Sequence, residues 1–184
     1  MRKLSHALLL LALALASAAC DVQPPPTATP IPLPTLIPTP YLETRRYTGE
    51  GFAIDYPAGW IATRSGQGEA LFRPGDGSNT LGMSVHTLKA TGADADALLD
   101  AHRSQVLASV PDAAYSEDRM DAPGGGRSDF YQDWRAEPRL QYQVTIYIQD
   151  GRAFRVVQWA PVVEWDRLWY NFFARMLAGF EAIG

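Results

Sequence analysis

Residues 140–159 read LQYQVTIYIQDGRAFRVVQW, a pattern typical of two β-strands joined by a tight turn. Along residues 140–149, apolar residues alternate with polar or aromatic ones, which is the period of a strand. Asp150 and Gly151 then supply a two-residue turn, because glycine adopts positive φ without strain and aspartate tolerates it better than most residues. Residues 152–159 are the return strand. The stretch therefore predicts a β-hairpin.

The register of this hairpin indicates what must surround it. A two-residue turn pairs Val144 with Val157 and Tyr147 with Phe154. Because successive side chains of a strand point to opposite faces, both faces of the hairpin then carry apolar groups. A sheet that is apolar on both faces must be covered on both faces.

Upstream of the hairpin, short apolar or alternating runs separated by turn residues predict further strands. These runs are residues 52–56, 60–63, 70–72, 81–86, 114–120 and 128–135. An acidic start and an apolar stripe indicate a helix over residues 94–109, which Pro111 prevents from continuing. A last helix is expected to begin at Glu164. Its apolar stripe consists of Trp165, Leu168, Trp169, Phe172, Met176 and Phe180.

The predicted fold class is thus α+β, an antiparallel β-sheet with one helix inserted midway and one at the C-terminus. Residues 51–60 read GFAIDYPAGW, a strand followed by a Pro-x-Gly-Trp turn. This opening resembles that of PsbP-like domains, and the closing hairpin and aromatic helix are similar too, so that the resemblance covers about residues 48–182. It implies an α/β/α sandwich in which helices cover the sheet.

The resemblance implies a family that is mostly non-enzymatic and gives no catalytic motif to transfer. PsbP-like domains occur in the extrinsic PsbP subunit of photosystem II and in bacterial lipoproteins. Their partners differ, so the fold by itself does not settle the function.

The N-terminus is typical of an export signal. Arg2 and Lys3 precede a Leu/Ala-rich run over residues 7–16, which is too short for a permanent membrane span. Residues 17–20, SAAC, resemble a bacterial lipobox, although Ser17 stands where a branched apolar residue is usual. The resemblance implies lipidation of Cys20, and the protein is then held in the membrane through that lipid. Ordinary signal cleavage, leaving a free thiol, is the alternative.

Residues 24–40 contain eight prolines, four threonines and no charge, which excludes a helix or a central strand. We expect a disordered, extended linker that lifts the domain off the membrane. A ligand for proline-recognising modules, or an O-glycosylated stalk, is the alternative. The expected organisation is a signal peptide over residues 1–19, an anchor and linker over residues 20–46, and a globular domain over residues 47–184.

Composition excludes several classes of function. Removal of the signal lowers the number of basic residues from 16 to 14 against 20 acidic ones, a net charge of about −6. Nucleic-acid binding is therefore not expected, because its affinity comes largely from basic residues on phosphates. The domain contains no cysteine, which leaves no disulfide and no thiolate ligand for a metal. We expect no cofactor.

Residues with catalytic or metal-binding chemistry form no motif. His86 and His102 are the only histidines outside the signal, and neither belongs to a zinc motif. His102 lies on the apolar stripe of its helix, which favours a core residue. Residues 76–80 lack the glutamate of a calcium loop, and no Gly-x-Ser-x-Gly is present. Acidic pairs such as Asp129 and Asp133 are expected on solvated faces.

What remains is a possible interface. It consists of Tyr131, Trp134, Arg135, Arg139 and Arg155, residue types that are enriched at binding hot spots. The simpler alternative is that Trp134 and Trp159 lie beneath a helix. The favoured function is a membrane-anchored lipoprotein on the extracytoplasmic face, whose non-catalytic domain binds an envelope protein or assists assembly. A small-molecule-binding module is the second hypothesis, and an envelope hydrolase the third.

Overall fold

The structure is a computed structural model that describes residues 43–49, 51–65, 68–89 and 92–184. These residues fall within one compact unit, residues 38–184. The expected signal peptide, the lipidation of Cys20 and the proline-rich linker lie outside the described residues. Among the residues that are described, no helix has the length and apolar character needed to cross a membrane.

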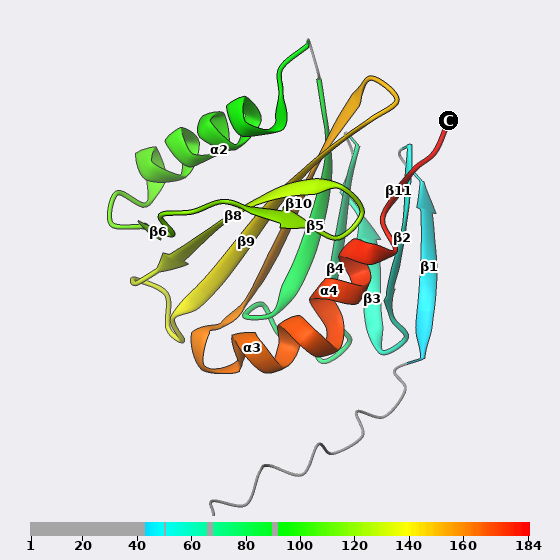
Figure 1. The fold of residues 1–184 in the computed structure, drawn as a ribbon. Helices are drawn as coiled ribbons and strands as arrows, with labels where there is room; N and C mark the ends of the chain where they lie inside the picture. Colours follow the sequence, from blue (N-terminus) through cyan, green and yellow to red (C-terminus); the bar gives the residue numbers. More distant parts are fainter. Residues whose placement is uncertain (1–42, 50, 66–67, 90–91) are drawn as a thin grey trace, which may run out of the picture. The chain divides into compact units, whose positions relative to one another are not determined.

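Eleven strands and five helical segments make up the described part of the chain (Figure 1). The strands are β1 Thr44–Gly49, β2 Phe52–Pro57, β3 Trp60–Arg64, β4 Glu69–Pro74, β5 Gly82–Leu88, β6 Ala114–Tyr115, β7 Met120–Ala122, β8 Gly126–Asp133, β9 Leu140–Gln149, β10 Arg152–Pro161 and β11 Glu181–Ala182. Helix α2 spans Ala95–Ser109. The C-terminal segment is a 3-10 turn η1 Val162–Glu164, α3 Trp165–Leu168, a π-helical turn η2 Trp169–Phe173 and α4 Ala174–Ala178.

The strands form two antiparallel sheets. The larger has the order β3-β4-β5-β10-β9-β8-β6, with β7 also paired to β8, and the smaller has the order β1-β2-β11. The hairpin β9–β10 lies at the centre of the larger sheet, and its predicted register is confirmed, with Val144 opposite Val157 and Tyr147 opposite Phe154. Asp150 and Gly151 both have positive φ, as the turn requires.

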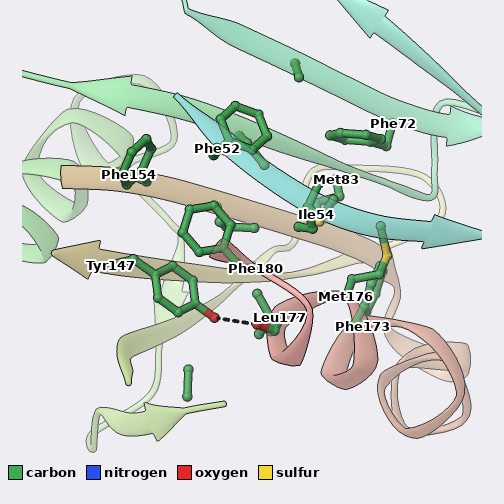
Figure 2. Packing of buried hydrophobic residues seen from close by; sticks show 14 of the residues in the cluster. Phe52, Ile54, Phe72, Met83, Tyr147, Phe154, Phe173, Met176, Leu177 and Phe180 are labelled. Carbon is green, nitrogen blue, oxygen red and sulfur yellow. Dashed lines mark hydrogen bonds between the residues drawn. The ribbon is translucent and has the colours of Figure 1, made fainter. Parts of the chain in front are cut away.

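The larger sheet has two different faces. One face, which carries Tyr147, Phe154 and Val156, packs against β2 and the C-terminal helices; we call it the aromatic face (Figure 2). The opposite face, which carries Val144 and Ile146, packs against α2; we call it the α2 face. The described domain is thus α+β, with helical segments on both sides of an antiparallel sheet, as expected.

Helix α2 covers only part of its face. It packs on β8 and β9, whereas Ile61 of β3, whose side chain is on the same face, is 57% exposed. The expected cover is present on both faces, and on the α2 face it lies at the β8–β9 end. At the β3 end the α2 face alternates polar residues with apolar ones, so less cover is needed.

The last helix differs from the expected single helix. A π-helical turn inserts an extra residue per turn and shifts the helical phase. As a result Phe173 and Leu177 enter the core, while Phe172 is only half-buried. The side-chain Nε2 of Gln158 donates a hydrogen bond of 3.2 Å to the carbonyl of Phe173 and supports this irregular turn.

Several strand boundaries also differ from expectation. β1 precedes the expected first strand and begins at Thr44, before the expected domain start at residue 47. The run over residues 114–120 is divided into β6 and β7, because the hydroxyl of Ser116 donates to the carbonyl of Asp118 and turns the chain. β8 ends at Asp133, whose carboxylate accepts from the backbone N–H of Arg135 at 2.9 Å.

Candidate interaction surface

The structure separates the five residues of the expected interface into two groups. Trp134, Arg135 and Arg139 lie in the exposed connection between β8 and β9. Tyr131 and Arg155 lie instead on the α2 face of the sheet, where the ring of Tyr131 is buried and Arg155 contacts α2. A single surface containing all five does not form.

The exposed group is built around an indole and a guanidinium. Trp134 is 50% exposed, and Arg139 places its Cζ atom 4.3 Å from the centre of the indole ring, a cation–π geometry. Arg139 has no carboxylate partner within the part of the chain that the structure describes. The backbone N–H of Val162 donates to the carbonyl of Arg139 at 3.0 Å, which brings the adjoining Val163, 91% exposed, beside the loop. We call Trp134, Arg139 and Val163 the Trp134 surface.

Arg135 has a different role. Its Nη2 lies 2.7 Å and its Nε 3.2 Å from the carboxylate of Asp112, in the segment that follows α2. The pair is exposed on both sides, so it contributes little to stability. Arg135 therefore joins the β8–β9 connection to the chain after α2 rather than presenting a free cation.

The two tryptophans of the simpler alternative behave differently from each other. Trp134 is half exposed, so the alternative that places it beneath a helix is wrong for this residue. Trp159 is buried, but its ring packs directly over Gly82, and its Nε1 donates to the carbonyl of Asn79 at 3.0 Å. The sequence left this alternative open because it does not indicate where α2 lies on the sheet.

A shallow recess is lined in part by residues that come shortly before Trp134 in the sequence. Its volume is about 280 Å³, and its walls include Tyr115, Phe130, Gln132 and Gln141. Gln132 lies two residues before Trp134 and donates from Nε2 to the side-chain oxygen of Gln141 at 2.9 Å. The recess thus offers amide groups beside aromatic rings.

On the α2 face, charged residues from three neighbouring strands form a row that the sequence did not reveal. Glu69 of β4 lies opposite His86 of β5, and His86 lies opposite Arg155 of β10. Helix α2 adds His102, whose Nδ1 is 3.2 Å from Nη1 of Arg155. No spacing along the chain could have indicated this row, since the pairing of distant strands creates it.

Burial shifts the acid–base properties of this row. It lowers the pKa of His102 to about 4, with a further contribution from the positive charge of Arg155. Burial and Arg155 also lower the pKa of His86, against a raising effect of Glu69. Burial lowers the pKa of Arg155 as well. Both imidazoles are therefore neutral at pH 7.

The row includes a serine, a histidine and a glutamate in contact, but not with triad geometry. The hydroxyl of Ser84 and the carboxylate of Glu69 each lie 3.2 Å from the same nitrogen, Nε2 of His86. A Ser-His-acid triad needs the serine and the acid on opposite ring nitrogens. The arrangement offers a polar contact network and gives no support to hydrolysis.

Asp129 does not lie on a solvated face, contrary to the prediction from the sequence. Its side chain is only 2% exposed, and it accepts from Nε and Nη2 of Arg103 at 3.1 and 3.0 Å. Nε of Arg119 lies 3.7 Å away. This carboxylate is a buried anchor for α2 rather than part of a solvated face. Elsewhere among the described residues, no group of three or more histidine, cysteine or acidic side chains is placed to hold a metal ion.

Comparisons with known proteins identify the fold. No protein-family model and no curated protein matches the chain. Among solved structures, cyanobacterial PsbP (CyanoP) from Synechocystis sp. PCC 6803 is similar, with a TM-score of 0.55, 15% sequence identity, and coverage of 77% of this chain and 93% of that one. A crystal structure from Bacteroides thetaiotaomicron VPI-5482 aligns with a TM-score of 0.46, 18% identity, and coverage of 76% and 48%. The likeness to CyanoP shows that the described domain has a PsbP-like fold.

Proposed function

We propose that this chain, whose globular part has a PsbP-like fold, is a lipid-anchored extracytoplasmic protein that binds a protein partner through the Trp134 surface. Its lipid is carried on Cys20, and the proline-rich linker separates the domain from the membrane. The domain acts without catalysis, by holding or helping to assemble an envelope protein.

The observation that supports binding is the exposure of Trp134 beneath the guanidinium of Arg139. An exposed tryptophan offers a large apolar area, and Arg139 lacks a carboxylate partner among the residues that are described. Tryptophan and arginine are the residue types that most often dominate binding energy at interfaces. A partner that covers the indole and supplies a carboxylate to Arg139 satisfies both groups at once.

The anchor is supported by the sequence pattern of residues 1–40. A basic start, a short apolar run and small residues lead to the only cysteine of the chain, and an uncharged proline-rich tract follows. Several acyl chains on one residue hold a protein stably in a bilayer, whereas a single chain does not. Mass spectrometry of the mature N-terminus tests this part. A diacylated or triacylated Cys20 supports the anchor, and an unmodified Cys20 or a terminus at Asp21 overturns it.

Small-molecule binding has weaker support. The recess beside Gln132 and Gln141 has a volume of about 280 Å³, slightly below the usual range of about 300 to 1,000 Å³ for ligand pockets. It is also shallow, so it would bury little of a ligand. Hydrolysis is not favoured, because Ser84 and Glu69 share one nitrogen of His86.

Affinity capture with matched variants tests the binding surface. Proteins crosslinked to the full-length chain in native membranes are compared for the wild type, Trp134→Ala, Arg139→Ala and the control Ile61→Ala. Ile61 has a similar exposure, 57%, but lies at the β3 end of the sheet. We expect a partner that Ile61→Ala retains and that both other variants lose. Equal recovery with all four proteins contradicts the proposal.

A further inference from the structure

Helix α2 is held on the sheet partly by a histidine that must remain uncharged. We propose that His102 and Arg155 form an acid-sensitive latch, and that protonation of His102 releases α2 from the β8–β9 end of the sheet. This inference concerns the α2 face and does not depend on the Trp134 surface.

The hydrogen bond between the two residues sets the protonation state of His102. Nδ1 of His102 lies 3.2 Å from Nη1 of Arg155. A guanidinium has only donors, so Nδ1 must be the acceptor, and the ring proton is on Nε2. A protonated imidazole has no acceptor left. Protonation therefore replaces this hydrogen bond with two cations in contact.

The surroundings offer little to neutralise a second cation. Nε2 of His102 and Nε of Arg155 are both buried and have no hydrogen-bond partner among the described residues. Water has little access to them, so the added charge is poorly solvated. Buried charges of like sign at this separation are costly unless they are paired.

Every element around His102 contributes charged or titratable groups. They are Arg103 on α2, Glu69 on β4, His86 on β5, Asp129 and Tyr131 on β8, Tyr142 on β9 and Arg155 on β10. Of the two carboxylates, Asp129 is bound by Arg103, and Glu69 contacts His86. Neither is placed to bind His102, and His86 adds a second site for a proton beside Arg155.

The direction of the pH effect follows from the pKa of His102. Burial lowers that pKa to about 4 in the folded protein, against an ordinary value of 6.5 when the side chain is in water. Between these values the released helix binds a proton that the docked helix does not bind. Docking is therefore fully favoured above pH 6.5 and becomes weaker as the pH falls toward 4.

Other contacts of α2 persist through most of this range. Leu99 and Val106 pack against Val144 and Ile146, and this packing does not titrate. The interaction with Arg119 lowers the pKa of Asp96, so that this ion pair is still formed at pH 5. His102 is thus a contact of α2 that acid removes while this packing and this ion pair remain. Its loss weakens the contact that covers the apolar residues under the helix.

Hydrogen exchange of the full-length chain tests the latch. Exchange is measured by mass spectrometry at pH 7.0 and pH 4.5, with correction for the intrinsic rates, and the protection of α2 is compared with that of β9. In the wild type we expect α2 to lose protection by about tenfold or more at pH 4.5. In His102→Gln the amide oxygen still accepts from Arg155 but does not titrate, so most of the loss should vanish.

Two further variants keep the test decisive. Arg155→Met removes the neighbouring cation, and we expect it also to weaken the acid response of α2. His86→Gln removes the second imidazole and should leave most of that response in place. The proposal is overturned if α2 of the wild type keeps its protection at pH 4.5. It is equally overturned if His102→Gln and Arg155→Met both respond to acid as the wild type does.

Discussion

The two faces of the larger sheet are held by different forces. On the aromatic face, the buried rings of Phe52, Phe154 and Phe180 pack on one another (Figure 2). On the α2 face, a buried carboxylate, Asp129, and a histidine–arginine contact accompany a smaller apolar cluster. The aromatic face gains its stability from area removed from water, which pH affects little. The α2 face depends on charge states, so it is the side from which we expect regulation and local opening.

The largest expected effect is on the aromatic face. Phe154→Ala removes a fully buried ring that packs against Phe52 and Phe180, and it should lower the free energy of unfolding by about 3–5 kcal/mol. Urea denaturation measures this change. Leu107→Ala, at a partly exposed position of α2, is the control and should change stability by less than about 0.5 kcal/mol. Similar losses for both variants would remove the contrast between core and surface.

The next effect is on the α2 face. Asp129→Ala leaves Arg103 and Arg119 without their shared carboxylate, which should cost about 2–3 kcal/mol because both cations can partly regain water. The exposed pair of Arg135 and Asp112 is the control, and Arg135→Gln should cost less than about 1 kcal/mol. Urea denaturation and circular dichroism follow both variants. If the two cost the same, Asp129 is not the anchor of α2.

A smaller effect is expected at Gly82 of β5, which lies opposite Trp159 of β10. A Cβ atom at Gly82 would lie 2.5 Å from Cζ2 of Trp159 and 3.0 Å from the carbonyl oxygen of Phe72. Gly82→Ala should therefore destabilise the protein by about 2 kcal/mol through overpacking. Gly59→Ala, where a Cβ would meet nothing within 4 Å, should be nearly neutral. Thermal unfolding of the two variants measures the difference, and a neutral Gly82→Ala would show that Trp159 can move aside.

The smallest effect on stability is expected at the Trp134 surface. Trp134→Ala and Arg139→Ala alter exposed side chains and should change the free energy of unfolding by less than about 0.5 kcal/mol each. Urea denaturation provides the measurement. A loss of several kcal/mol would mean that the two residues support the fold, and their effect on partner capture would then have another explanation.

How much could be predicted from the sequence differs between the two faces as well. The hairpin register and the position of α2 are local properties, set by a two-residue turn and by Asp94, whose carboxylate accepts from the N–H of Ala97 at 2.7 Å. Both were predicted correctly. The π-helical turn was missed because its support, the side chain of Gln158, comes from another element.

The candidate site was less predictable for the same reason. Trp134 and Arg139 are close in sequence, so their contact after β8 can be predicted from the sequence pattern. Arg155 and His102 meet only because β10 pairs with β9, on which α2 packs, and Arg103 from that helix binds the buried Asp129. Residue types alone grouped Arg155 with the surface, whereas tertiary pairing places it half-buried against His102 of α2.

Site-specific photocrosslinking in native membranes tests the central proposal most directly. A photoreactive amino acid replaces Trp134 in one full-length chain and Ile61 in another, so that both positions are exposed but lie at opposite ends of the larger sheet. The account predicts one dominant protein adduct from position 134, absent from position 61 and lost when Arg139→Glu is added. No adduct at position 134, or the same adducts from both positions, would contradict a protein-binding role for the Trp134 surface.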